Sequence, residues 1–144
     1  MEESLSGILQ KSPEDIRGYS PLALAFVGDG IFDLVIRTIV MTSGGNRPVK
    51  KLHRDKAALV NAHAQAQMAE YLQDRLTDEE RDILRRGRNA HPATTAKNQT
   101  LADYRAATGL EALCGWLYMT GQIGRLLELV EAGLEGAAEG SHGR

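Results

Sequence analysis

The 144-residue sequence contains a single cysteine, Cys114, so it can build neither an internal disulfide nor a zinc site of several cysteines. The N-terminus lacks a basic segment followed by an apolar one, and no apolar run is long enough to cross a bilayer. The sequence shows no strand-like alternation, no internal repeat and no glycine-rich phosphate loop after a strand. These absences predict an all-α protein in the reducing cytoplasm.

The composition fits one domain with an uneven distribution of charge. With 42% hydrophobic residues, the chain can bury one core but is too short for two ordinary domains. We expect that domain over residues 18–133, between an N-terminal segment, residues 1–17, and a disordered tail, residues 134–144. The net charge is only -2, yet basic residues gather in residues 47–56 and 81–105. Such clusters favour binding to an anionic polymer, with solvated helix faces as the alternative.

Capping and turn residues predict where helices begin and end. Ser20 followed by Pro21 is a helix start, and Thr77 with Glu80 three residues later has the form of a capping box. We expect helices over residues 21–42, 46–72, 77–84, 100–120 and 122–132. Residues 86–99, RGRNAHPATTAKNQ, lack periodicity and collect Gly, Asn, Pro and Thr, which predicts a basic loop.

Two of these helices carry an acidic residue among apolar neighbours. Asp29 interrupts a helix that is apolar nearly all round, a pattern typical of a helix surrounded by protein, where an unpaired carboxylate is costly. Gly28 and Gly30 flank Asp29, and the lack of side chains there indicates close approach of another helix, an ion or a phosphate. Glu111 has a similar setting of small and apolar residues in a later helix.

If they face each other, the carboxylates of Asp29 and Glu111 form an oxygen-rich site suited to Mg²⁺, which takes few protein ligands. An ion held there activates water for attack on a phosphodiester and stabilises the developing charge. From the residues alone, the alternative is that either acid pairs with a buried arginine or caps a neighbouring helix. Asp33, one turn after Asp29, is better explained as the i+4 partner of Arg37.

Together, LALAFVGDGIFDLVIR and TGLEALCGWLY resemble the signature helix and the later acidic helix of the ribonuclease III family. With the PVKKLH segment between them and the loop RGRNAHPATTAKN before YRAATGLEAL, the sequence looks closest to the small bacterial branch, Mini-ribonuclease III, over residues 18–133. The resemblance implies an all-α endonuclease domain, a helical bundle that forms a homodimer. It also implies cleavage of double-stranded RNA with Mg²⁺, for which Mn²⁺ can substitute.

The resemblance assigns roles to individual residues. Asp29 matches the aspartate of the family's Gly-Asp signature, and Glu111 matches the glutamate of its Glu-Ala-Leu signature. Both matches imply metal binding and catalysis. Classical members have two further acids, whose places are taken here by Ala25 and Thr108, and this departure leaves the number of ions open.

The resemblance also implies partners. Two centres in a homodimer each cut one strand, leaving 5′-phosphate and 3′-hydroxyl ends, and the branch's association with ribosomal RNA maturation makes precursor 23S rRNA the expected substrate. A ribosomal protein is a candidate for presenting that RNA, and no separate double-stranded-RNA-binding domain is expected. The predicted dimer-interface residues, for which ordinary core is the alternative, are Phe26, Val27, Ile31 and Leu34. The predicted RNA-binding residues are Arg85, Arg86, Arg88, Asn89, His91, Thr94, Thr95, Lys97, Asn98, Lys50, Lys51 and Arg54.

Other function classes explain these residues less well. A noncatalytic RNA-binding helical module in ribosome assembly is the main alternative, but it gives no reason for keeping both Asp29 and Glu111. A His-Asp metal phosphohydrolase needs an adjacent His-Asp pair, which His53, His63 and His91 do not supply. Metal-dependent cleavage of RNA distinguishes these classes.

Overall fold

The computed structural model describes residues 5, 16, 18–90 and 100–142. Its helices are α2 (Pro21–Ser43), α3 (Val49–Val60), α4 (Ala62–Leu72), α5 (Asp78–Asn89), α6 (Leu101–Met119) and α7 (Ile123–His142), with the 3-10 turn η2 (Gln73–Arg75) after α4. No strand occurs in these residues, which confirms the all-α prediction. None of the helices in this part of the chain is long and apolar enough to cross a membrane.

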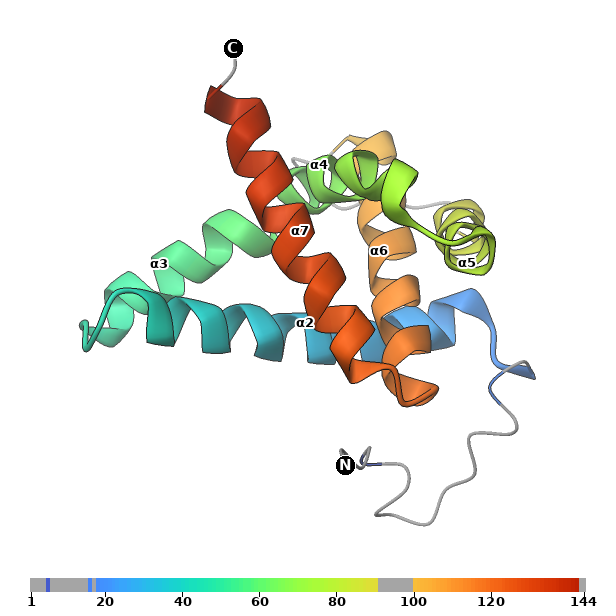
Figure 1. The fold of residues 1–144 in the computed structure, drawn as a ribbon, viewed down its shortest axis with the longest axis horizontal. Coiled ribbons are helices and arrows are strands. Elements are labelled where there is room, and N and C mark those ends of the chain that lie inside the picture. The colour runs from blue at the N-terminus through green and yellow to red at the C-terminus, as the bar shows by residue number, and fades with distance from the viewer. Residues whose placement is uncertain (1–4, 6–15, 17, 91–99, 143–144) are drawn as a thin grey trace.

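The helices pack around α2 and α6. Figure 1 shows α2 lying across the molecule, with α6 crossing its N-terminal half and α3 turning back beside its C-terminal half. Helices α4 and α5 pack on α6, and α7 packs on α4. The core between them is apolar, and its most deeply buried side chains include Phe32, Ile36, Met68, Leu113 and Leu126.

The predicted helix starts are confirmed by their caps. The hydroxyl of Ser20 accepts a hydrogen bond from the first turn of α2, and that of Thr100 accepts one from the first turn of α6. Thr77 and Glu80 form the reciprocal capping box at the start of α5. Each cap satisfies backbone N–H groups that have no partner inside the helix.

The single helix predicted over residues 46–72 is wrong, because the chain breaks at Asn61. The backbone of Asn61 is extended, with ψ 162°, and its side-chain oxygen accepts a hydrogen bond of 2.8 Å from the N–H of Ala64. Its side-chain nitrogen donates to the carbonyl of Ala57 at 3.1 Å. Asn61 therefore ends α3 and caps α4 at once, which asparagine does better than it continues a helix.

Two helices are longer than predicted. Helix α5 continues to Asn89, so residues 86–89 are helical rather than part of a loop. Arg86 and Arg88 stabilise this last turn, because positive side chains interact favourably with the free carbonyl groups at the C-terminal end of a helix. Helix α7 continues to His142, beyond residue 132, where the last helix was predicted to end. Small residues allow this extension, because a Cβ atom at Gly136 would lie 2.2 Å from the ring of Tyr71.

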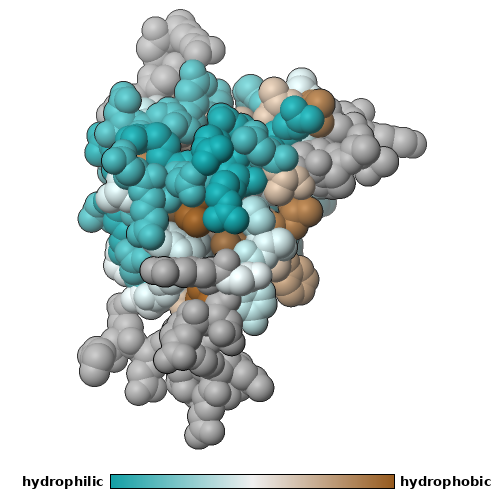
Figure 2. Space-filling view, turned by 90° about the vertical axis from the view of Figure 1, so that its right-hand side faces the viewer, coloured by the Kyte–Doolittle hydropathy of each residue, from teal (hydrophilic) through white to brown (hydrophobic). Residues whose placement is uncertain are grey.

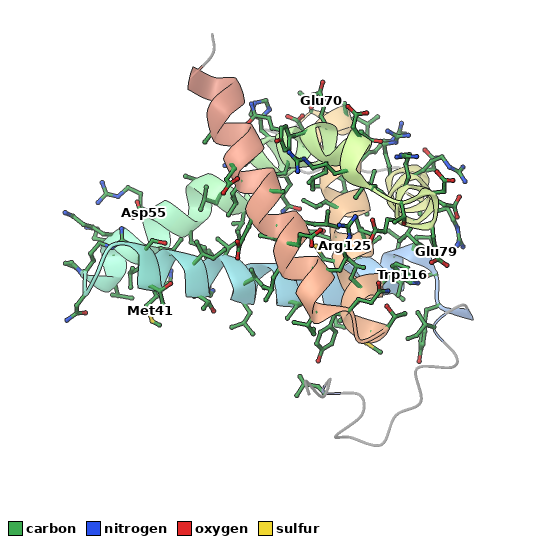
Figure 3. The ribbon with its side chains drawn as sticks, in the orientation of Figure 1. Met41, Asp55, Glu70, Glu79, Trp116 and Arg125 are labelled. Carbon is green, nitrogen blue, oxygen red and sulfur yellow. The ribbon has the colours of Figure 1, made fainter. Side chains whose placement is uncertain are left out.

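A charged pair between α5 and α7 stabilises the fold. Two nitrogens of Arg125 donate to the two carboxylate oxygens of Glu80 at 2.8 and 2.9 Å, and Glu80 is only 3% exposed. Figure 3 shows Arg125 directed from α7 toward the α5 side of the molecule. The guanidinium beside Glu80 holds the pKa of that carboxyl below its usual range. The pair thus joins the capping box of α5 to the start of α7.

Replacing Arg125 with methionine should lower the free energy of unfolding by about 3 kcal/mol, because a buried carboxylate loses its partner. Urea unfolding at neutral pH measures this. Arg85→Met, which breaks the more exposed pair with Asp82, is the matched control and should cost less than about 1 kcal/mol. Equal losses in the two variants would contradict a structural role for the Glu80–Arg125 pair.

Candidate active site

Helices α2 and α6 touch backbone to backbone where they cross. A Cβ atom at Gly28 would lie 1.7 Å from the carbonyl oxygen of Glu111, and one at Gly115 would lie 1.9 Å from that of Leu24. Only glycine fits at either position. The crossing therefore places residue 29 of α2 beside residue 111 of α6.

Gly30 does not share this role. A Cβ atom at Gly30 would meet nothing within 4 Å, so the predicted close approach holds at Gly28 and not at Gly30 within the single chain. Within the single chain, α2 is not surrounded by protein on all sides, since one face is open. Of the predicted interface residues, Phe26 is 83% and Leu34 58% exposed, while Val27 and Ile31 are half-buried.

The carboxyl groups of Asp29 and Glu111 face each other at this crossing. Asp29 lies on the exposed side, whereas Glu111 is largely shielded from solvent. Burial, followed by the charge of Asp29 and a hydrogen bond with it, raises the pKa of Glu111 from its ordinary value of 4.5 to about 7. Two carboxylates this close form a site that favours either a proton or a cation.

Neither acid has an arginine or lysine partner among the described residues, so the structure gives no support to the buried-arginine alternative. Asp33 points to other partners, because Arg37 lies 2.6 Å and Lys56 3.1 Å from its carboxylate, as expected for an ordinary ion pair. Thr108 is 8% exposed one turn before Glu111, and its hydroxyl donates to the carbonyl of Tyr104. Ala25 is buried.

Sequence reasoning missed one residue of the site, Gln65 of α4. Its side-chain nitrogen donates to the carbonyl of Val60 at 2.8 Å and to the carboxylate of Glu111 at 3.3 Å. Gln65 and Glu111 line a cavity of about 190 Å³ together with Val60, Asn61, Ala62, Tyr104, Ala107 and Thr108. The only signal in the sequence was a polar residue at a core position of an alanine-rich helix, which also fits an ordinary helix former.

The oxygen donors at the crossing fit a divalent cation such as Mg²⁺. Within the described chain, no group of three or more His, Cys, Asp or Glu side chains gathers around one point. Two carboxylates in contact are enough, because Mg²⁺ binds proteins through one or two carboxylates and keeps several waters. The nearby thiol of Cys114 does not compete, since burial and the charge of Glu111 raise its pKa to about 12.

The predicted RNA-binding residues fall into two exposed clusters and one group that lies outside the described residues. Arg85, Arg86, Arg88 and Asn89 are exposed on the last turns of α5, and Figure 2 shows mostly hydrophilic residues on the face of the molecule that carries this helix. Lys50, Lys51 and Arg54 are exposed on α3. His91, Thr94, Thr95, Lys97 and Asn98 lie outside the described residues.

Comparison with known proteins gives a consistent result. The family model of the ribonuclease III domain matches residues 22–122. The chain is 41% identical to Mini-ribonuclease 3 of Thermoanaerobacter sp. over 94% of its length and 97% of the relative, and 42% identical to that of Staphylococcus aureus over 80% and 87%. A crystal structure of a protein from Fusobacterium nucleatum superposes with a TM-score of 0.75 at 32% identity, covering 85% of this chain and 97% of that one.

The matches cover both helices that form the crossing, so fold, site and similarity agree. The chain belongs to the ribonuclease III family, in its Mini-ribonuclease 3 branch. It is an endoribonuclease of that family.

The raised pKa of Glu111 predicts how the metal-free protein responds to pH. The folded state holds this proton up to about pH 7 and the unfolded state only to about 4.5, so the stabilisation is complete below 4.5 and is lost as pH rises through 7. In EDTA, the melting temperature of the wild type should therefore fall more between about pH 5 and about pH 8 than that of Glu111→Gln. Parallel curves for the two proteins would show that Glu111 titrates normally.

Proposed function

We propose that the chain hydrolyses double-stranded RNA with Mg²⁺ held by Asp29 and Glu111, and that Mn²⁺ can replace Mg²⁺. The observation that carries this proposal is the contact between two carboxyl groups that have no basic partner in the described chain. A divalent ion bound there stabilises the charge that develops on the phosphate and activates water for attack. Membership of the ribonuclease III family supports RNA as the substrate.

The basic clusters supply contacts to the RNA. An A-form duplex is recognised through its phosphates and 2′-hydroxyl groups, which arginine, lysine and asparagine side chains can reach. The α5 cluster consists of Arg85, Arg86, Arg88 and Asn89, and the α3 cluster of Lys50, Lys51 and Arg54. Figure 1 shows α3 and α5 at opposite ends of the molecule, so the clusters contact separate stretches of a duplex. His91, Thr94, Thr95, Lys97 and Asn98, which lie outside the described residues, are proposed as further contacts to the RNA.

The active form is proposed to be a homodimer that pairs through the open face of α2. Phe26, Gly30 and Leu34 follow one another at intervals of four residues, and Met41 continues the same side of the helix. Phe26, Leu34 and Met41 are 83%, 58% and 59% exposed, and Figure 3 shows Met41 directed away from the other helices. An exposed apolar stripe of this kind can pack against the same stripe of a second copy about a two-fold axis. A two-fold dimer also suits a duplex, because each active site can then cut one of the two strands. Val27 and Ile31 flank the stripe.

Precursor 23S rRNA is the proposed substrate, cut in the cytoplasm to leave 5′-phosphate and 3′-hydroxyl ends. This part of the proposal is supported by the similarity to Mini-ribonuclease 3 proteins. Double-stranded ends of a ribosomal RNA precursor match the proposed two-fold enzyme. A ribosomal protein that presents this RNA is included in the proposal.

The purified protein should cut labelled double-stranded RNA, and leave single-stranded RNA intact, in Mg²⁺ but not in EDTA. Asp29→Asn and Glu111→Gln should each reduce kcat by at least about a thousandfold, because the carboxylate pair is lost. Joint replacement of Arg85, Arg86 and Arg88 by alanine should instead raise KM and flatten its salt dependence, since fewer phosphates are neutralised. Binding of the duplex without cutting by the wild type would favour the noncatalytic module.

Gly30→Leu should turn the dimer into a folded monomer. A Cβ atom at Gly30 meets nothing within 4 Å in the described chain, and leucine favours the helix over glycine by up to about 1 kcal/mol, so we expect the fold to be kept. In a dimer paired through this face, the same side chain separates the two helices. Sedimentation velocity measures the change, and Gly28→Ala is the contrasting variant, which should lower the melting temperature. A Gly30→Leu protein that sediments as the wild-type dimer would move the interface elsewhere.

A further inference from the structure

Gln65 is buried in the first turns of α4, with only 4% of its surface exposed. Its position follows from the break at Asn61, which ends α3 and leaves the carbonyl of Val60 without a helical partner. The side-chain nitrogen of Gln65 donates to that carbonyl at 2.8 Å. The amide is therefore anchored to the backbone at the α3–α4 junction, close to α6.

The two acceptors around the amide determine its orientation. One hydrogen of the side-chain nitrogen goes to Val60 and the other to the carboxylate of Glu111, at 3.3 Å. Turning the amide over would set its oxygen against two other oxygens. In the observed orientation the side-chain oxygen of Gln65 is buried and has no donor among the described residues.

An unpaired buried carbonyl oxygen costs about 1–3 kcal/mol, so the amide is not explained by stability alone. A methionine of similar length would fill the same buried space without that cost. What only the amide provides is a donor to the carboxylate of Glu111. Gln65 and Glu111 both line the cavity of about 190 Å³ at this site, which is large enough to hold water.

We infer that Gln65 is a positioning residue of the active site, whose amide, held by the carbonyl of Val60, keeps the carboxylate of Glu111 directed toward Asp29. The inference rests on the proposed function of Asp29 and Glu111. Gln65 itself touches neither the RNA nor the reacting phosphate.

The test compares Gln65→Met and Gln65→Asn with Gln67→Met, a matched control on the same helix that does not line the cavity. Kinetics on double-stranded RNA in Mg²⁺ give kcat and KM, and electron paramagnetic resonance of Mn²⁺ added to the protein without RNA gives metal affinity. Both Gln65 variants should lose roughly 10- to 100-fold in kcat and in Mn²⁺ affinity, with KM for RNA unchanged. Asparagine is included because its shorter amide cannot reach Glu111 from the same backbone position.

The outcomes separate this inference from the proposed function. A wild-type protein that neither cuts duplex RNA nor binds Mn²⁺ at Asp29 overturns the proposed function itself. If the wild type cuts, a folded Gln65 variant with wild-type kcat and Mn²⁺ affinity overturns only the role of Gln65. Melting curves show which variants are folded, and a rise in KM with unchanged kcat would also overturn positioning, because it would place Gln65 in RNA binding.

Discussion

The contact between the backbones of α2 and α6 determines where the candidate active site lies. Gly28 and Gly115 remove the side chains that would hold the helices apart, and each would clash with a carbonyl of the other helix if it carried a Cβ atom. This approach carries Asp29 to Glu111. The fold and the chemistry therefore share one constraint, since a change that separates the helices also separates the carboxyl groups.

The same contact brings together the carboxyl groups of Asp29 and Glu111, whose negative charges repel each other. Glu111 loses hydration on burial and feels the charge of Asp29, and both effects favour its protonated form. A binding site for a cation needs the ionised form, so the features that suit the site work against the stability of the metal-free protein. Gln65 acts in the other direction, because its hydrogen bond to Glu111 favours the carboxylate. The rest of the fold offsets the difference, with the Glu80–Arg125 pair as one contributor.

Features that depend on neighbouring residues could be predicted from the sequence, and features that depend on tertiary contacts could not. The caps at Ser20 and Thr77 are local, and the two acids were conspicuous among apolar residues. The break at Asn61 was missed because asparagine occurs inside helices as well as at their starts, and packing decides between these roles. The same holds for Gln65, whose significance lies in a contact to a residue 46 positions away. The extension of α7 depends on Gly136 meeting Tyr71, which no local pattern records.

Helix α2 illustrates how one segment can serve two contacts. Gly28 faces α6 and is buried, whereas Gly30, two residues later, faces outward between Phe26 and Leu34. Because a helix turns by about 100° per residue, Asp29 lies at the border between these two faces. The carboxylate of Asp29 can therefore contact Glu111 of α6 on one side while it stays exposed to solvent on the other. The apolar sequence of α2 is thus explained by two faces. One face packs in the core, the other is the exposed stripe that carries Phe26 and Leu34, and Asp29 lies between them.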